Sequence, residues 1–219
     1  MKQESFTLYF KVLLMDKEKY LEDLKDIKEM MNRSSRFISL SGMSGICAGV
    51  FSLIGAYTGF QTIYSSQEYM GYRWENLTNE SLISLIGIAV GVIILSIITG
   101  IYFTTQKAKA LNEELWDHHT KRYLINLSIP LVSGGILCLI LLLKGYGGLI
   151  APLTLIFYGL ALVNGSHFTL KETRNLGLIE ILLGLLAIAY VQYGLIFWAI
   201  GFGVLHIIYG AFMHFNTSK

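Results

Sequence analysis

Six apolar runs separated by polar segments dominate the chain. An α-helix rises about 1.5 Å per residue, so roughly 20 apolar residues cross a hydrocarbon core of about 30 Å. The runs cover residues 37–60, 81–104, 124–143, 148–164, 176–190 and 195–213. This pattern predicts an all-α fold, a six-helix transmembrane bundle of three hairpins. Only residues 144–147 separate the third run from the fourth, which predicts a tight hairpin there.

The segment before the first run, residues 1–36, has a different pattern. Within residues 16–36 the apolar side chains Tyr20, Leu24, Ile27 and Met31 recur at spacings of four, three and four. Such spacing puts them on one face of a helix, which predicts a cytoplasmic amphipathic helix. Its apolar face could lie on the membrane surface, pack under the bundle or pair with another chain. The structure of residues 1–15 stays open. The chain therefore divides into a cytoplasmic segment, 1–36, and a membrane domain, 37–215.

The basic residues are distributed unevenly between the two sides of the predicted bundle. With the N-terminus inside, 15 of the 17 Lys and Arg residues fall on the inner side, and only Arg73 and Lys144 lie outside. Basic residues in short loops resist translocation, so this split fixes the orientation. The sequence predicts a multi-pass protein of the cell membrane with both termini in the cytoplasm.

The composition agrees with a membrane location and excludes other classes. The chain of 219 residues is 53% hydrophobic and 15% charged, with a mean hydropathy of +0.54. A net charge of +2 is too small to indicate a nucleic-acid partner. Cys47 and Cys138 lie inside apolar runs without metal-ligand spacing, and we expect neither a metal nor a cofactor. The predicted partners are the lipid bilayer and, through residues 16–36, a cytoplasmic protein or a second copy of the chain.

Small residues recur at a spacing of four in the first two runs. They are Ser41, Gly45 and Gly49 in the first run and Gly87 and Gly91 in the second. Small side chains let helix backbones approach closely in lipid, where packing drives association. We therefore predict that these five residues lie at helix–helix contacts.

A Tyr-Gly pair recurs in the fourth and sixth runs, as Tyr158-Gly159 and Tyr209-Gly210. An arginine also precedes each odd-numbered run. Together these features suggest three related hairpins, but the positive-inside rule by itself places an arginine at each inner end. Duplication and convergence both stay open.

Two ionisable residues interrupt the apolar runs, Glu180 in the fifth and His206 in the sixth. Intramembrane ionisable groups are costly and commonly functional. Four further polar residues fall near the same predicted level: Asn126, Asn164, His167 and Arg174. We predict an inward-facing polar cluster that serves the transport of an ion or a small solute. The alternative is a Glu–His or Glu–Arg pair that fixes helix register, and no mid-span Gly-Pro break supports a transport site.

One short motif raises the question of catalysis. The sequence Gly42-Met-Ser44-Gly45 resembles the serine motif of rhomboid-type intramembrane proteases, which also have six spans and a histidine on the sixth. Ser44 and His206 fall at a similar predicted depth, so a Ser–His hydrolase is a remote alternative. The motif lies on the first run instead of the fourth, and the second run has no histidine. The sequence therefore favours a protein that is not an enzyme.

Two stretches resemble an uncharacterised family of bacterial six-span integral membrane proteins. They are RSSRFISLSGMSG, residues 33–45, and GFGVLHIIYG, residues 201–210. The likeness extends from about residue 20 to the end of the chain. It implies a bacterial inner membrane and assigns no activity and no catalytic residue. A membrane sensor or regulator that presents its N-terminal helix to a cytoplasmic partner therefore stands as the alternative to a transporter.

Overall fold

The computed structural model describes residues 20, 24–25, 41–64, 78–110, 118–169 and 171–216, and the structural statements that follow concern these residues. The contacts divide the chain into two units, Met1–Phe37 and Ile38–Lys219. The predicted amphipathic helix, residues 16–36, lies outside the described residues except for Tyr20, Leu24 and Lys25. Its existence stays a prediction.

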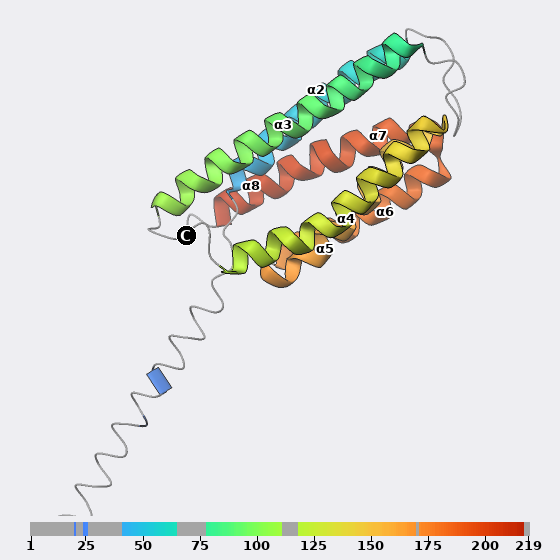
Figure 1. Cartoon of the computed structure of the whole chain (residues 1–219). Helices are drawn as coiled ribbons and strands as arrows, with labels where there is room; N and C mark the ends of the chain where they lie inside the picture. Colours follow the sequence, from blue (N-terminus) through green and yellow to red (C-terminus); the bar gives the residue numbers. More distant parts are fainter. Residues whose placement is uncertain are drawn as a thin grey trace, which may run out of the picture. The chain divides into compact units, whose positions relative to one another are not determined.

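The helices of the second unit follow the six apolar runs (Figure 1). The first three runs form α2 (Gly42–Tyr64), α3 (Asn79–Ala110) and α4 (His118–Leu143). The fourth forms η1 (Gly147–Leu149), α5 (Ile150–Gly165) and η2 (Ser166–Phe168), and the fifth forms α6 (Lys171–Ala189). After η3 (Val191–Tyr193), the sixth is continuous through α7 (Gly194–Trp198), the π-helical segment η4 (Ala199–Leu205) and α8 (His206–Asn216). The described residues contain no strand.

Five helical segments are long and apolar enough to cross a membrane. They are Gly42–Ile63, Asn79–Ala110, Thr120–Leu143, Gly147–Phe168 and Val191–Phe215. The 19 residues of α6 are not among them, and they include Lys171, Glu172, Arg174 and Glu180. The structure therefore identifies an all-helical polytopic membrane protein, and the count of six spans stays a prediction.

The hairpin between α4 and α5 is as tight as predicted, and its geometry explains the sequence there. Gly145 adopts a positive φ of 81°, a conformation that suits glycine. The Tyr146 amide donates to the Leu141 carbonyl at 2.9 Å, and the Gly145 amide donates to the Leu142 carbonyl at 3.0 Å. These two bonds form a Schellman motif, which satisfies the last carbonyls of α4.

The helices form an open arc. Their packing order is α3, α2, the continuous α7–η4–α8 helix, α6, α5 and α4. The two helices at the ends of the arc, α3 and α4, make no comparable contact with each other in the described chain. Indeed α3 packs mainly on α2 and has no buried residue. The arc is therefore open between α3 and α4 (Figure 1).

Glycines allow two of the crossings in this arc. A Cβ on Gly45 would lie 3.2 Å from the Gly210 Cα, and one on Gly49 would lie 2.6 Å from the Gly203 carbonyl oxygen. The α2 backbone therefore contacts the backbone of η4 and α8. Between α5 and α6, a Cβ on Gly159 would lie 2.5 Å from the carbonyl oxygen of Gly177. Such close approach is the usual effect of small residues in membrane helices.

The other predicted packing residues differ from Gly45 and Gly49. A Cβ on Gly87 or Gly91 of α3 would meet nothing within 4 Å, so neither glycine lies at a helix contact within the described chain. Ser41 directly precedes α2, and its carbonyl accepts the Ser44 amide at 3.0 Å. The repeated small residues of α2 therefore lie at a helix contact, whereas those of α3 face away from the other described helices.

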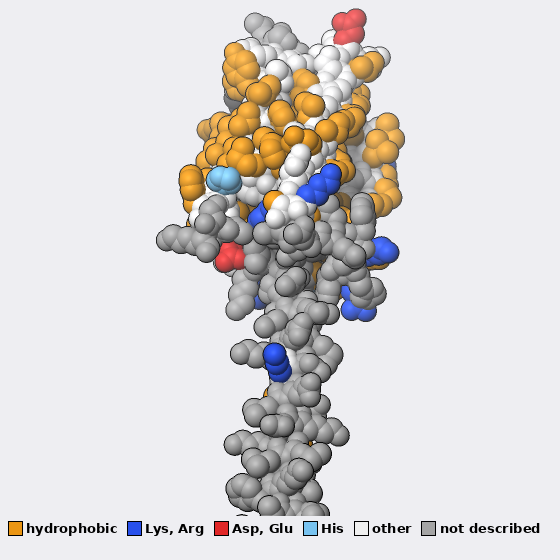
Figure 2. All heavy atoms as spheres, turned by 90° about the vertical axis from the view of Figure 1, so that its left-hand side faces the viewer, with side chains coloured by type: hydrophobic (Ala, Val, Ile, Leu, Met, Phe, Trp, Pro, Cys, Tyr) orange, Lys and Arg blue, Asp and Glu red, His pale blue; other side chains and the backbone are white. Residues whose placement is uncertain are grey.

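Apolar side chains cover much of the outside of the bundle. Figure 2 shows them as a broad band, with Lys and Arg side chains gathered at its lower edge. Large apolar residues such as Ile98 and Ile101 of α3 are more than half exposed. Such a surface requires lipid and not water around it.

Candidate functional site

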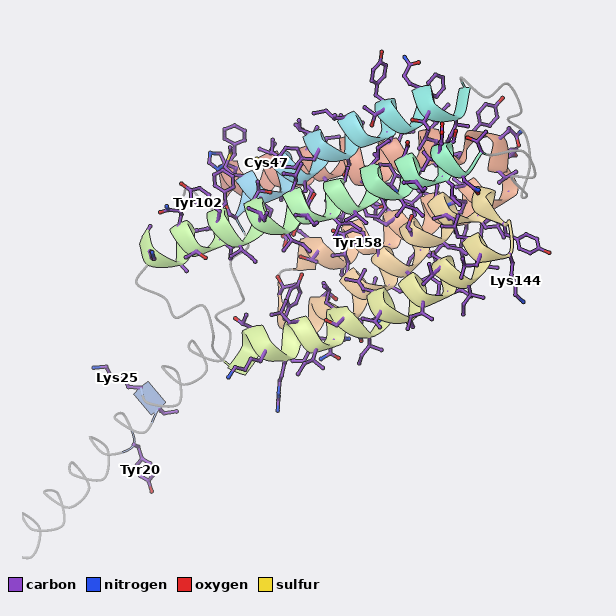
Figure 3. All side chains as sticks on the ribbon, turned by 45° about the horizontal axis from the view of Figure 1, so that its top comes forward. Tyr20, Lys25, Cys47, Tyr102, Lys144 and Tyr158 are labelled. Carbon is purple, nitrogen blue, oxygen red and sulfur yellow. The ribbon has the colours of Figure 1, made fainter. Side chains whose placement is uncertain are left out.

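Three side chains from three helices meet at the middle of the bundle. Glu180 lies nine residues from either end of α6. His206 lies twelve residues after the start of α7 and ten before the end of α8. Tyr158 lies eight residues after the start of α5, and Figure 3 shows it inside the bundle between the ends marked by Tyr102 and Lys144. Because α6 begins five residues earlier than the predicted span, Glu180 lies deeper than the sequence indicated.

His206 connects the other polar groups. Its Nδ1 lies 2.9 Å from the Gly201 carbonyl oxygen and 3.5 Å from Oε1 of Glu180, and its Nε2 lies 2.8 Å from the Tyr158 hydroxyl. A carbonyl oxygen can only accept a hydrogen bond, so Nδ1 must carry a proton. Nε2 is then the nitrogen that either accepts from Tyr158 or, when protonated, donates to it.

Glu180 is the most unusual group in the described core. Its side chain is 0% exposed, and neither carboxylate oxygen has a hydrogen-bond partner among the described residues. Burying an unpaired carboxylate costs on the order of several kcal/mol, even after the surrounding protein relaxes. Hydroxyl side chains elsewhere in the helices are hydrogen-bonded to the backbone of their own helix. The Thr99 hydroxyl, for example, donates to the Leu95 carbonyl at 2.8 Å.

The π-helical segment η4 positions His206 and makes room for Glu180. Such segments are rare and occur frequently at functional sites. The ring of His206 reaches the carbonyl of Gly201, five residues earlier in the same segment. A Cβ on Gly201 would collide with Oε2 of Glu180 and lie 2.5 Å from Cδ2 of Leu155. The sequence contains no mid-span Gly-Pro pair, and η4 is the irregular helical segment next to Glu180 and His206.

A cavity of about 620 Å³ occupies the inside of the arc. Residues from α2, α3, α4, α5 and the α7–η4–α8 helix line it, and most of them are apolar. Tyr158 and His206 lie at the end of this lining that is nearest the middle of the bundle, which we call the deep end. The aromatic rings of Trp198 and Phe202 lie next to them. From there the lining extends toward the end of the bundle that carries Lys144, as far as Ile63, Leu85, Gly147 and Val191.

The six predicted polar residues do not form one cluster. Glu180 and His206 meet, whereas the Asn164 side chain donates to the Asn126 carbonyl at 2.7 Å, between α4 and α5. His167 and Arg174 are exposed. Of the six, only His206 lines the cavity. The described contacts therefore join Glu180 to His206 and Asn164 to Asn126, because equal depth along separate helices does not make all the side chains face each other.

The Ser–His pair does not form. The Ser44 hydroxyl donates to the carbonyl of Ser41 at 2.5 Å, and the described partners of the His206 ring are Tyr158, Gly201 and Glu180. A serine nucleophile needs a base within hydrogen-bond reach. The hydrolase alternative has no support in this geometry.

Sequence reasoning missed the roles of Tyr158 and Gly201. The Tyr-Gly repeat was the available signal, since both tyrosines make hydrogen bonds between helices. Tyr158 bonds to His206, and Tyr209 lies 2.8 Å from the Thr173 hydroxyl of α6. Each following glycine lies against the backbone of a neighbouring helix.

The functional interpretation depends on this geometry. No family model matches the chain, and no curated protein and no solved structure matches it either.

Proposed function

We propose that this chain is a membrane transport protein that moves a proton, alone or together with a small solute, through Glu180 and His206. The observation that carries the proposal is the buried Glu180 carboxylate, which lacks hydrogen-bond partners among the described residues while lying beside a histidine that lines a cavity. A pair that only fixed helix register would be expected to satisfy its oxygens. Buried carboxylates and histidines are typical of intramembrane proton relays.

Two proton arrangements are compatible with the distances. In the neutral one, Glu180 holds a proton and Nε2 of His206 accepts from the Tyr158 hydroxyl. In the ionised one, that proton is on Nε2 of His206, which donates to Tyr158, and Glu180 is a carboxylate. The resulting imidazolium and carboxylate attract each other over 3.5 Å. The two arrangements hold the same number of protons, so the net charge of the site is the same in both.

Proton flux into vesicles tests this proposal. Purified protein is reconstituted with a trapped pH-sensitive dye, and a potassium diffusion potential drives protons inward. We expect the wild type to exceed empty vesicles and Glu180→Gln to lose at least about tenfold in rate, since the amide cannot exchange a proton. Glu172→Gln, on the same helix but in its first turn, is the matched control and keeps the wild-type rate. Wild-type flux in Glu180→Gln, or none in the wild type, refutes the proposal.

We propose that the chain crosses a bacterial inner membrane six times, with α6 as the fifth span. Both termini would then lie in the cytoplasm. The charges support this topology, because the basic residues of the helix ends gather at one end of the bundle. They are Lys107 and Lys109 at the end of α3, Lys121 and Arg122 at the start of α4, and Arg174 at the start of α6. Lys144 belongs to the opposite end. With this orientation the cavity extends toward the side away from the cytoplasm.

A regulatory function is the second candidate, and the spacing of Tyr20, Leu24, Ile27 and Met31 favours it. Tyr20 and Leu24 are 65% and 60% exposed within their unit. An exposed apolar face on a helix is suited to a protein partner or to a second copy of the chain. Cross-linking in cells, with and without residues 1–30, tests this function. Recovery of the same proteins in both cases refutes it.

A further inference from the structure

We propose that the cavity inside the arc binds a lipophilic molecule that ends in a hydroxyl group, such as a long-chain alcohol or an alkylated phenol. The hydroxyl group of this molecule donates a hydrogen bond to the oxygen of Tyr158. This molecule would be the solute that the proposed transport function moves. Its binding to the cavity does not depend on transport, and only its role as cargo rests on the proposed function.

The walls of the cavity favour a lipophilic occupant. A volume of about 620 Å³ is in the range of small-molecule sites. We place the mouth between α3 and α4, because both helices line the cavity and do not pack substantially on each other in the described chain. Since both helices are apolar enough to cross a membrane, the mouth faces hydrocarbon. A molecule that enters there comes from the bilayer.

Water fits the cavity poorly. A buried water needs two to four polar partners, roughly, and most of the lining is apolar. The hydroxyl of Thr154, which belongs to the lining, already donates to the Ala151 carbonyl at 2.8 Å. The other polar side chains of the lining are Ser52, Ser96 and Gln192, and Tyr158 and His206 are the polar pair at the deep end. The cavity therefore suits an apolar body with one polar terminus.

The hydrogen bonds of Tyr158 and His206 indicate which polar group the ligand carries at its end. Nδ1 of His206 donates to the Gly201 carbonyl, so in the neutral ring Nε2 is an acceptor and uses the single O–H of Tyr158. The Tyr158 oxygen then has a lone pair left and no proton to give. A ligand must supply the donor, which a hydroxyl group does and a hydrocarbon or an ether does not.

Aromatic rings surround this polar end. The ring centroid of Phe202 lies 4.9 Å from that of Tyr158, 5.0 Å from that of Trp198 and 5.9 Å from that of His206. Rings at such distances provide flat apolar walls that hold a chain or a ring in one orientation. Trp198 also lines the cavity, so its fluorescence reports on an occupant.

Quenching of Trp198 by brominated probes tests the inference. Trp74 and Trp116 are replaced by Phe, which leaves Trp198 as the only tryptophan of the chain. The protein, in lipid nanodiscs and without any gradient, is titrated with 11-bromoundecan-1-ol or with 1-bromoundecane. We expect saturable quenching by the alcohol, with an apparent affinity about fivefold higher than that of the alkane, since one hydrogen bond separates the two probes.

Two glycine variants distinguish the cavity from the general lipid surface. Gly135 lines the cavity and Gly87 does not, and a Cβ on either would meet nothing within 4 Å. Gly135→Leu therefore narrows the cavity, its Cβ meeting no neighbour, and should weaken saturable quenching, while Gly87→Leu, the matched control, should preserve it. Tyr158→Phe should remove the advantage of the alcohol over the alkane.

Three outcomes would overturn the inference. Quenching that does not saturate, or that is unchanged in Gly135→Leu, would place the probes in bulk lipid. Equal affinity for alcohol and alkane would mean that the cavity holds any acyl chain. Failure of binding is distinguishable from failure of transport, because binding without flux refutes only the transport function, and flux without saturable quenching refutes only this inference.

Discussion

Gly201 and Glu180 lie so close that a methyl group on Gly201 would collide with Oε2 of Glu180. The carbonyl of the same glycine accepts the Nδ1–H of His206 at 2.9 Å. One residue of the π-helical segment therefore makes room for the carboxylate and orients the imidazole. The site depends on this backbone position as much as on the two ionisable groups.

Replacing Gly201 by alanine should destabilise the protein by about 1–3 kcal/mol, because the added methyl group must displace Glu180 or Leu155 in a packed interior. The free energy of unfolding is measured by denaturant titration in mixed micelles. Gly87→Ala is the control, and it should be neutral or up to about 1 kcal/mol stabilising, since the position is open and alanine favours helix. Equal effects at the two positions would show that Gly201 is not confined as described.

Glu180→Gln should leave the free energy of unfolding unchanged or raise it. The carboxylate oxygens have no hydrogen-bond partner among the described residues, and a neutral amide of the same shape is cheaper to bury. The same denaturant titration measures the effect. A loss of more than about 2 kcal/mol would mean that the carboxylate is a structural partner, since breaking a buried pair is that costly. Unchanged stability would attribute any loss of proton flux to chemistry and not to folding.

Thr173 of α6 and Tyr209 of α8 should stabilise each other. Their hydroxyl oxygens lie 2.8 Å apart, between helices whose other polar contacts are few. We expect a coupling energy of about 0.5–1.5 kcal/mol in a double-mutant cycle of Thr173→Val and Tyr209→Phe. A coupling energy near zero would show that the hydrogen bond contributes nothing.

Cysteine labelling tests the orientation of the bundle. Cys47 and Cys138 are first replaced by alanine, and single cysteines are then introduced at Lys144 and Arg122, which are both exposed. In intact bacterial cells, an impermeant maleimide should label Lys144→Cys, whereas Arg122→Cys should react only after permeabilisation. The reverse pattern would place the Lys144 end of the bundle in the cytoplasm.

The sequence determined the positions of the helices, because the length of an apolar run and the need to satisfy every backbone group in lipid are local properties. It also determined the tight hairpin at Gly145, where the turn requires a positive φ. Glu180 and His206 could be selected from the sequence for the same local reason, since each is an ionisable group in an apolar run.

Only the tertiary structure decided which of these residues meet. Gly45 and Gly87 belong to similar patterns, yet one lies against Gly210 and the other faces open space. Likewise Glu180 contacts His206 and not Arg174, and the cavity extends toward Lys144 and not toward the predicted inner side. Spacing along one helix fixes which side chains share a face, but the partner of that face depends on how all the helices pack.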